Sequence, residues 1–394
     1  MRRNTVAGLV LALVVTALSS PVHAQVDTEA SPASSLEPAT SQTAPAAEPS
    51  LAFADPRWRK LAPGKGPAGR EDHTWTVDGN GRFAYLFGGR DGGREFGDLW
   101  RYDLRRDRWQ KLAPKGMRPQ PRFGHSAVWT DSHGLVIFAG QRGDDFFDDL
   151  WAFDPGQGKW RKLPSGGSGP KRRYGSCMVV GPDGRLWISH GFTSSGRFDD
   201  TRAYNLKQKK WAAITPDGRK PGERCLHDCF TTAAGEMVLY GGQDDGAFAL
   251  GDLWTMGRDR TWRRLGDPAP APRRLYAVTE AGDQAYLFGG AGEDNAAFND
   301  LWRVDRETLE FERVRVAGNH PAARYAGTLI TDPERGRLLL FGGQGRKAKS
   351  DVWELVDRSG SVHAAEVPAG SEEGDEPDAI VEETPAPTPA ASGG

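Results

Sequence analysis

Six arginine residues recur along the chain at a nearly constant interval. Successive members are 52, 51, 51, 50 and 50 positions apart, and they are Arg70, Arg122, Arg173, Arg224, Arg274 and Arg324. A guanidinium group binds carboxylates and phosphates through paired hydrogen bonds, so several guanidinium groups brought together form an anion-binding site. The spacing therefore predicts these six arginines as candidate binding residues for an anionic ligand.

We call these six repeat-related residues the arginine column. A second set of repeat-related residues, the histidine column, lies three positions after the first and contains three histidines. The residues of this column are His73, His125, Ser176, His227, Ala277 and Gly327. Because the histidines occupy equivalent places in different units, we do not expect them to share one metal ion. If the protein were an enzyme, His125 or His227 would be the acid–base residue.

Cysteine spacing argues against a metal site. In a β-strand, which rises about 3.3 Å per residue, Cys225 and Cys229 would lie about 13 Å apart. That distance excludes both a shared metal ion and a disulfide between them. A disulfide between Cys177 and Cys229 is compatible with an exported protein, but we expect free, buried thiols instead.

Motifs that mark common enzyme classes are missing from the sequence. It contains no Gly-x-Ser-x-Gly elbow, no His-Glu-x-x-His motif and no phosphate-binding Gly-Lys-Ser/Thr loop. We therefore predict a non-catalytic protein that needs no metal and no cofactor.

The arginines and histidines belong to a repeating unit of about 50 residues. Six apolar segments each end in two small residues, and the second of these is at position 89, 140, 191, 242, 290 or 343. A polar loop and an Asp follow, as in Asp98-Leu-Trp100, and a signal such as Trp109-x-x-Leu112 closes the unit. With an apolar segment upstream of each pair, the pattern predicts four short strands per unit. Stacking six such sheets radially would bury both faces of each sheet.

This order of signals resembles the kelch repeat and covers residues 55–367. The resemblance implies an all-β fold, a six-bladed kelch-type β-propeller with four antiparallel strands per blade. It also implies that the six arginines surround one mouth of a central channel. Some kelch propellers hold acidic peptides with such arginines, but arginines in this place also hydrogen-bond the carbonyls of neighbouring loops. The third unit departs most, with Ser189-His-Gly191 in place of the glycine pair, and we expect its blade to keep its strands and to pack most loosely.

Two segments compete to complete the last blade. Trp58-x-x-Leu61 precedes the first unit and keeps the repeat pattern, whereas Val362 to Val367 follows the last unit and has no Trp. A ring of blades closes most securely when one end of the chain completes the sheet begun by the other. We therefore predict that the segment near Trp58 becomes the outer strand of blade six.

The two ends of the 394-residue chain differ in composition from its middle. Residues 1–24 have a positive start, an apolar stretch and small residues before Gln25, which predicts a cleaved signal peptide. Residues 25–54 are rich in Ala, Pro, Ser and Thr, and residues 368–394 carry seven acids and no Lys or Arg, so we expect both segments to be disordered. Residues 55–367 carry seven more basic than acidic residues. The acidic tail could thus fold back on the arginine mouth and regulate access to it.

These features predict an exported, non-catalytic recognition module, periplasmic or extracellular and monomeric. Its partner would be a protein, a peptide or a carbohydrate, either anionic or neutral, bound at the channel mouth or on one loop face. We expect no nucleic acid ligand and no membrane span after signal cleavage. Two alternatives stay open. The first alternative is an enzyme that resembles exported sugar mutarotases, because an arginine ring would suit the carboxylate of an acidic sugar. The second alternative is a structural envelope protein.

Overall fold

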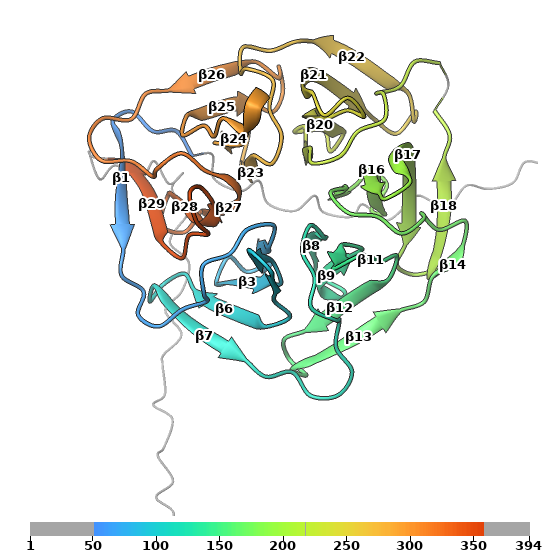
Figure 1. The fold of residues 1–394 in the computed structure, drawn as a ribbon, viewed down its shortest axis with the longest axis horizontal. Helices are drawn as coiled ribbons and strands as arrows, with labels where there is room; N and C mark the ends of the chain where they lie inside the picture. Colours follow the sequence, from blue (N-terminus) through green and yellow to red (C-terminus); the bar gives the residue numbers. More distant parts are fainter. Residues whose placement is uncertain (1–50, 217, 358–394) are drawn as a thin grey trace, which may run out of the picture. The chain divides into compact units, whose positions relative to one another are not determined.

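The computed structural model describes residues 51–216 and 218–357, and its strands form six sheets arranged in a ring, each with four antiparallel strands and one of them with a short fifth strand (Figure 1). The prediction of an all-β six-bladed propeller is confirmed. The predicted signal peptide, nearly all of the spacer, the acidic tail and the segment Val362 to Val367 lie outside the described residues. Within the described residues, no helix is long and apolar enough to cross a membrane.

Each blade runs from an innermost strand at the channel to an outermost strand at the circumference. Blade 1 contains β2 (Thr74–Val77), β3 (Phe83–Phe87), β6 (Leu99–Asp103) and β7 (Arg108–Leu112). Blade 2 contains β8 (Ser126–Thr130), β9 (Gly134–Phe138), β12 (Leu150–Asp154) and β13 (Lys159–Leu163). Blade 3 contains β15 (Cys177–Val180), β16 (Leu186–Thr193), β17 (Gly196–Asn205) and β18 (Lys210–Ile214), with β14 (Gly166–Gly167) added in parallel to β18.

The second half of the ring follows the same order. Blade 4 contains β19 (Asp228–Thr231), β20 (Met237–Gln243), β21 (Ala249–Met256) and β22 (Trp262–Gly266). Blade 5 contains β23 (Ala277–Ala281), β24 (Gln284–Phe288), β25 (Leu301–Asp305) and β26 (Phe311–Val314). Blade 6 contains β27 (Tyr325–Asp332), β28 (Arg337–Gln344), β29 (Val352–Asp357) and β1 (Pro56–Leu61).

Blade 6 shows how the ring closes. The N-terminal strand β1 pairs antiparallel with β29, with Trp58 opposite Leu355. The prediction that the segment near Trp58 completes the last blade is therefore confirmed. Trp58 is 5% exposed and packs edge-on against Phe288 of blade 5, so β1 contributes a residue to the apolar core between blades 5 and 6.

The hydrophobic core is divided into six parts, one between each pair of adjacent blades. One part, for example, joins Leu86 of blade 1 to Leu339 of blade 6. The second strand of each blade is buried on both faces because each sheet is covered by two neighbours, which explains its continuous apolar run. Blade 3 keeps its four strands as expected, and Leu186, Trp187 and Ile188 in its second strand are completely buried. Looser packing of this blade as a whole stays a prediction.

A glycine is needed where each second strand ends. Gly89 has a φ of +92°, and a Cβ atom there would lie 2.8 Å from the carbonyl oxygen of Glu71. A side chain at this position would therefore be strained in its backbone and would clash with the segment that leads into the first strand of its own blade.

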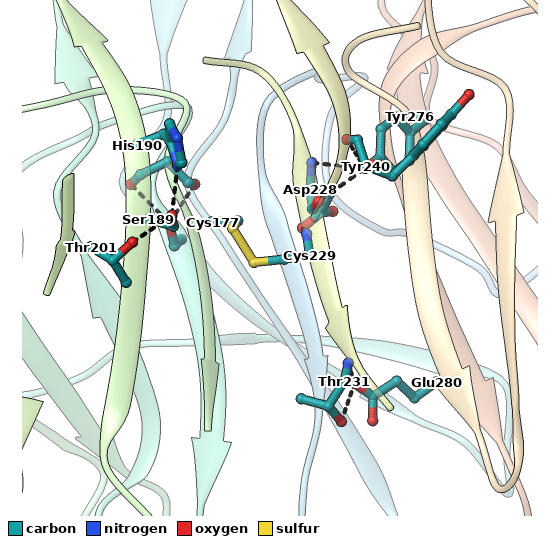
Figure 2. Close-up of a disulfide and its surroundings, with 12 residues drawn as sticks. Cys177, Ser189, His190, Thr201, Asp228, Cys229, Thr231, Tyr240, Tyr276 and Glu280 are labelled. Atoms are coloured by element: carbon teal, nitrogen blue, oxygen red, sulfur yellow. Dashed lines mark hydrogen bonds between the residues drawn. A yellow bond between two sulfur atoms is a disulfide. The ribbon is translucent and has the colours of Figure 1, made fainter. Parts of the chain in front are cut away.

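A disulfide joins Cys177 in β15 to Cys229 in β19 (Figure 2). Our expectation of free thiols is wrong for these two residues and holds for Cys225, which is free and buried. The Cα atoms of Cys177 and Cys229 lie 5.7 Å apart because the innermost strands of neighbouring blades converge on the channel, and this separation suits a disulfide. Spacing within one strand carries no information on such a distance between blades.

Removing this disulfide is expected to lower the free energy of unfolding by about 2–4 kcal/mol, because the bond restricts a long loop of the unfolded chain. The test is urea unfolding of the double variant Cys177→Ser, Cys229→Ser. Cys225→Ala is the matched control, since it removes a buried thiol but leaves the disulfide intact. Equal losses in both variants would show that the bond itself contributes little.

Candidate functional site

The arginine column is an internal brace of each blade. In blade 2, the Nη1 atom of Arg122 donates to Asp149 Oδ1 at 2.6 Å and to the carbonyl oxygen of Ala139 at 2.8 Å. Nη2 donates to Asp149 Oδ2 at 3.2 Å, so the guanidinium binds the carboxylate with both arms. Arg122 thus ties the start of its blade to the end of the second strand and the start of the third.

The same bidentate pair is present in all six blades. The pairs are Arg70–Asp98, Arg122–Asp149, Arg173–Asp200, Arg224–Asp252, Arg273–Asp300 and Arg324–Asp351. In five blades a Trp two residues after the Asp donates its indole N–H to the same carboxylate. Blade 3 has Arg202 there, and Arg202 Nε donates to Asp200 Oδ2 at 2.9 Å, so the departure of the third unit preserves the interaction.

One member of the predicted column is wrong. In blade 5 the brace is Arg273, whereas the adjacent Arg274 donates to Asn295 Oδ1 at the channel mouth. Five of the six predicted arginines are therefore braces, with 0–2% of each residue exposed. The geometry favours the structural role that the sequence left open, because each guanidinium already holds a carboxylate and has almost no surface for a ligand. Anion binding by these residues stays a prediction.

The aspartates of these pairs were recognised as a repeat signal, but sequence reasoning missed that each of them is the partner of an arginine. Each Asp follows its Arg by 27 or 28 positions, a constant separation that could have revealed the pair. Burial alone would raise the pKa of the Asp149 carboxyl, but the hydrogen bonds and positive charge of Arg122 outweigh it and hold the pKa below its usual value.

The histidine column lies between blades. His125 Nε2 is 2.9 Å from Thr74 Oγ1 of blade 1, and His73 Nε2 is 2.8 Å from Thr328 Oγ1 of blade 6. Burial lowers the pKa of both His125 and His227 to about 3, so each imidazole is neutral at pH 7. Both residues line the central channel, but burial disfavours the protonated ring that acid–base catalysis at pH 7 would use.

A closed ring of backbone hydrogen bonds surrounds the channel mouth. One residue from each blade donates its N–H to the carbonyl oxygen of its counterpart in the preceding blade, at 2.7–3.0 Å. We call this set the mouth ring, and its members are Asp72, Gly124, Gly175, Leu226, Leu275 and Ala326. All six have a positive φ, although four are not glycine. Because a left-handed backbone costs about 1 kcal/mol in such residues, the closed ring is what holds them there.

Two carboxyl groups face the channel inside this ring. The cavity has a volume of about 240 Å³ and is lined by all six innermost strands, with Asp72 and Asp228 among its wall residues. Burial raises the pKa of both carboxyls to about 7, and for Asp72 it outweighs the charge of Arg90, whose Nη2 is 3.3 Å from Asp72 Oδ2. In Figure 2, Asp228 lies next to the disulfide, and its backbone N–H and carbonyl oxygen both bond the hydroxyl of Tyr276.

The fold is expected to be most stable near pH 7. Burial lowers the folded pKa values of His73, His125, His190 and His227, so these rings take up protons only on unfolding as the pH falls below 6.5. Asp72 and Asp228 act in the opposite sense, because they keep their protons up to about pH 7 only when folded.

Near pH 5 the unfolded chain thus binds up to about two more protons than the folded chain, because burial also raises the pKa values of Glu71 and Asp332 and these groups offset part of the difference. Stability should therefore fall by up to about 3 kcal/mol per pH unit of acidification. Chemical unfolding at pH 5, 6, 7 and 8 measures this. Asp72→Asn should make the loss below pH 6 steeper, because it removes an opposing group. Greater stability at pH 5 than at pH 7 would contradict the conclusion that the four buried histidines stay neutral in the folded chain.

Around the mouth, the loops after the second strands form short hairpins that contact one another. They include β4 (Arg90–Asp91) with β5 (Arg94–Glu95), β10 (Gln141–Arg142) with β11 (Asp145–Phe146), the extended ends of β16–β17 and β20–β21, the 3₁₀ turn Glu293–Asn295 and residues 344–348. We call this surface the hairpin face.

Contacts between neighbouring hairpins hold the hairpin face in one arrangement. Glu95 Oε1 accepts the N–H of Gly143 in the next blade, and Arg197 Nη1 donates to Asp245 Oδ1 at 2.9 Å. Phe146 of blade 2 packs edge-on against Phe192 of blade 3. Because these loops are braced before any ligand arrives, little ordering entropy would be lost on binding.

Large exposed apolar side chains occur on both ends of the propeller. Phe248, at the tip of the blade 4 hairpin, is 61% exposed, and Met117, in the loop that leads from blade 1 to blade 2, is 72% exposed. Val180 is 42% exposed at the opposite end of the innermost strand β15. Exposed aromatic side chains of this kind often anchor protein–protein contacts.

Metal-binding groups are not assembled in this part of the chain. Among residues 51–216 and 218–357, no three His, Cys, Asp or Glu side chains are grouped so that they could hold a metal ion.

Comparison with known proteins agrees with this architecture. The model of the KLHDC2/KLHL20/DRC7 Kelch-repeats domain matches residues 50–242 and 217–361. A leucine-zipper-like transcriptional regulator 1 homolog of Drosophila melanogaster is 27% identical over 228 residues, which are 54% of this chain and 23% of that protein.

Other relatives carry different names. Kelch domain-containing protein 10 of Xenopus tropicalis is 24% identical over 247 residues, covering 56% of this chain and 59% of the relative. N-(sulfonatooxy)prop-2-enimidothioate sulfolyase of Thlaspi arvense is 31% identical over 184 residues, which cover 40% of this chain and 51% of the relative. In each case the similarity spans less than two thirds of the relative's length.

Proposed function

Because the chain belongs to the kelch-repeat family, we propose that it is an exported recognition module that binds a protein partner through the hairpin face. Kelch propellers generally bind proteins, which supports a protein rather than a small molecule as the partner. The observation that carries the proposal is the braced set of hairpins around the mouth, with Phe248 exposed at the tip of one of them. A rigid scaffold with variable loops is a common solution for recognition.

The disulfide supports export. Cys177–Cys229 is a structural bond between two blades, and such bonds persist in oxidising compartments rather than in the reducing cytosol. Together with the signal-peptide pattern of residues 1–24, it favours a periplasmic or extracellular protein. Mass spectrometry of the protein from its native cells should find Gln25 as the first residue and no free thiol at Cys177. A full-length, reduced chain would count against export.

The hairpin face can be tested by affinity capture with matched variants. Phe248→Asp places a charge at an exposed apolar position of that face, whereas Val180→Asp does the same at the opposite end. We expect a partner captured by the unchanged protein to be retained by Val180→Asp and reduced at least about tenfold by Phe248→Asp, which removes an aromatic anchor. A partner lost only with Val180→Asp would place recognition on the other face.

A further inference from the structure

The outermost strands of the six blades form a positively charged circumference. They carry twelve basic residues and one acidic residue, Glu312, and every one of these basic side chains is exposed. We call this surface the basic rim, and its members are Arg57, Arg59, Lys60, Arg108, Lys111, Lys159, Arg161, Lys162, Lys210, Arg263, Arg264 and Arg313. Basic residues on edge strands discourage pairing with other chains, which accounts for some of them.

The unpaired charge of the rim is concentrated on three neighbouring blades. On β1, β7 and β13, which belong to blades 6, 1 and 2, only Arg59 forms an ion pair within the described residues, with Glu354 at 2.8 Å. The unpaired residues there are Arg57, Lys60, Arg108, Lys111, Lys159, Arg161 and Lys162. By contrast, both basic residues of β22 pair with acids of their own blade. Protection of edges alone does not explain this uneven distribution, because every blade has an edge.

The C-terminal segment supplies the complementary charge and starts beside this sector. Residues 368–394 contain seven acids and no Lys or Arg. The last described residue, Asp357, lies opposite Pro56 in the pairing of β29 with β1, so the chain leaves blade 6 next to the basic strand β1. Glu372 is 15 residues further on, and a chain of that length reaches at most about 50 Å. The strand β1 lies directly beside that exit, and β7 belongs to the blade that follows blade 6 around the ring.

We propose that the acidic tail, residues 368–394, docks on the basic rim of blades 6, 1 and 2. The braces at the channel mouth are not available to it, because each of those guanidinium groups is buried and paired with an aspartate. Docking neutralises the rim and shields it from other polyanions. Since the basic side chains of the rim are exposed, the contact weakens as the Debye length falls below about 10 Å above 0.1 M salt.

Carbodiimide cross-linking of the full chain locates the tail, because it joins a carboxylate to a lysine that it contacts. At 0.05 M NaCl we expect cross-links from Glu372–Glu383 to Lys60, Lys111, Lys159 and Lys162, and their loss at 0.5 M NaCl. Lys347 on the hairpin face and Lys207 in blade 3 are exposed internal controls. Cross-links spread evenly over all lysines, or mainly between molecules, would overturn the proposal.

Competition with a labelled polyglutamate provides a second readout. Neutralising the seven tail acids to Gln or Asn in the full chain should tighten polyglutamate binding at least about fivefold at 0.05 M salt, because the rim is then uncovered. Adding Lys60→Gln, Lys111→Gln and Lys162→Gln should abolish that gain, whereas Lys171→Gln and Lys207→Gln should not. The three rim substitutions could weaken polyglutamate binding while neutralisation of the tail acids has no effect. In that case the rim binds an external polyanion, and the proposal that the tail docks on it is wrong.

Discussion

Replacing Arg337 with methionine is expected to lower the free energy of unfolding by about 5 kcal/mol, the upper end of the range for removing one partner of a buried ion pair. Arg337 lies in β28, and its side chain is 1% exposed. Its guanidinium donates to Asp332 Oδ2 and Glu354 Oε2 at 2.8 Å and to Asp107 Oδ1 at 2.6 Å. Asp332 and Glu354, which are also buried, would be left without this partner.

Arg337 matters especially because it lies at the seam of the ring. Asp107 belongs to the turn between β6 and β7 of blade 1, while Asp332 and Glu354 belong to blade 6. Arg337 Nη2 also donates to the carbonyl oxygen of Leu104 in blade 1 at 2.7 Å. The first and last blades are thus joined by this residue as well as by their apolar core.

Urea unfolding of Arg337→Met beside Arg335→Met tests this prediction. Arg335 binds the same Asp107, but its side chain is 41% exposed, so its loss should cost about 1 kcal/mol or less. Arg337→Met is also expected to expose Trp75, which lies in the apolar core between blades 6 and 1, and tryptophan fluorescence would report this. Similar small losses in both variants would mean that the seam does not depend on the buried network.

Arg122→Met is expected to destabilise the fold by about 3–5 kcal/mol, because Asp149 would be left partly buried without its guanidinium partner. The side chain of Arg122 is fully buried, and Asp149 is 15% exposed. Without Arg122, burial would raise the pKa of Asp149, so the variant should lose stability further as the pH rises through that value. The other five braces have the same geometry and should behave alike.

Arg172→Met is the matched control, because Arg172 is 70% exposed and its nitrogen is 3.7 Å from Asp148. Its loss should cost less than about 0.5 kcal/mol. The double variant Arg122→Met, Asp149→Asn should lose less than the sum of the single variants, since it removes both charges. If Arg122→Met is as stable as the unchanged chain, the arginine–aspartate pairs do not stabilise the blades. These arginines would then again be candidates for binding a ligand.

The repeat signals were sufficient to predict the fold because each signal marks a local requirement. The residue at Gly89 must adopt a left-handed backbone, and Trp58 carries the packing pattern of the other outermost strands into blade 6. The residues that meet such a requirement can be recognised in a single repeat unit, and their recurrence in six units makes the prediction of the fold specific. The number of blades and the closing strand followed from these patterns alone.

The site was less predictable because its contacts join different strands and blades. An arginine at a channel mouth and an arginine that braces a blade have the same spacing, and only the position of Asp149 distinguishes them. Two adjacent arginines, Arg273 and Arg274, fit the interval equally well, so the brace of blade 5 was assigned to the wrong one. The Cys177–Cys229 bond depends on the convergence of two blades, a distance that no sequence pattern contains.

Site-specific photo-cross-linking in the cells that produce this protein tests its role as a recognition module most directly. A photoreactive amino acid would replace Phe248 on the hairpin face or, separately, Val180 at the opposite end, since both positions are exposed. We predict a discrete adduct with one partner protein from position 248 and none from position 180. Adducts from position 180 alone, or none from either position while the protein is folded and exported, would contradict recognition through the hairpin face.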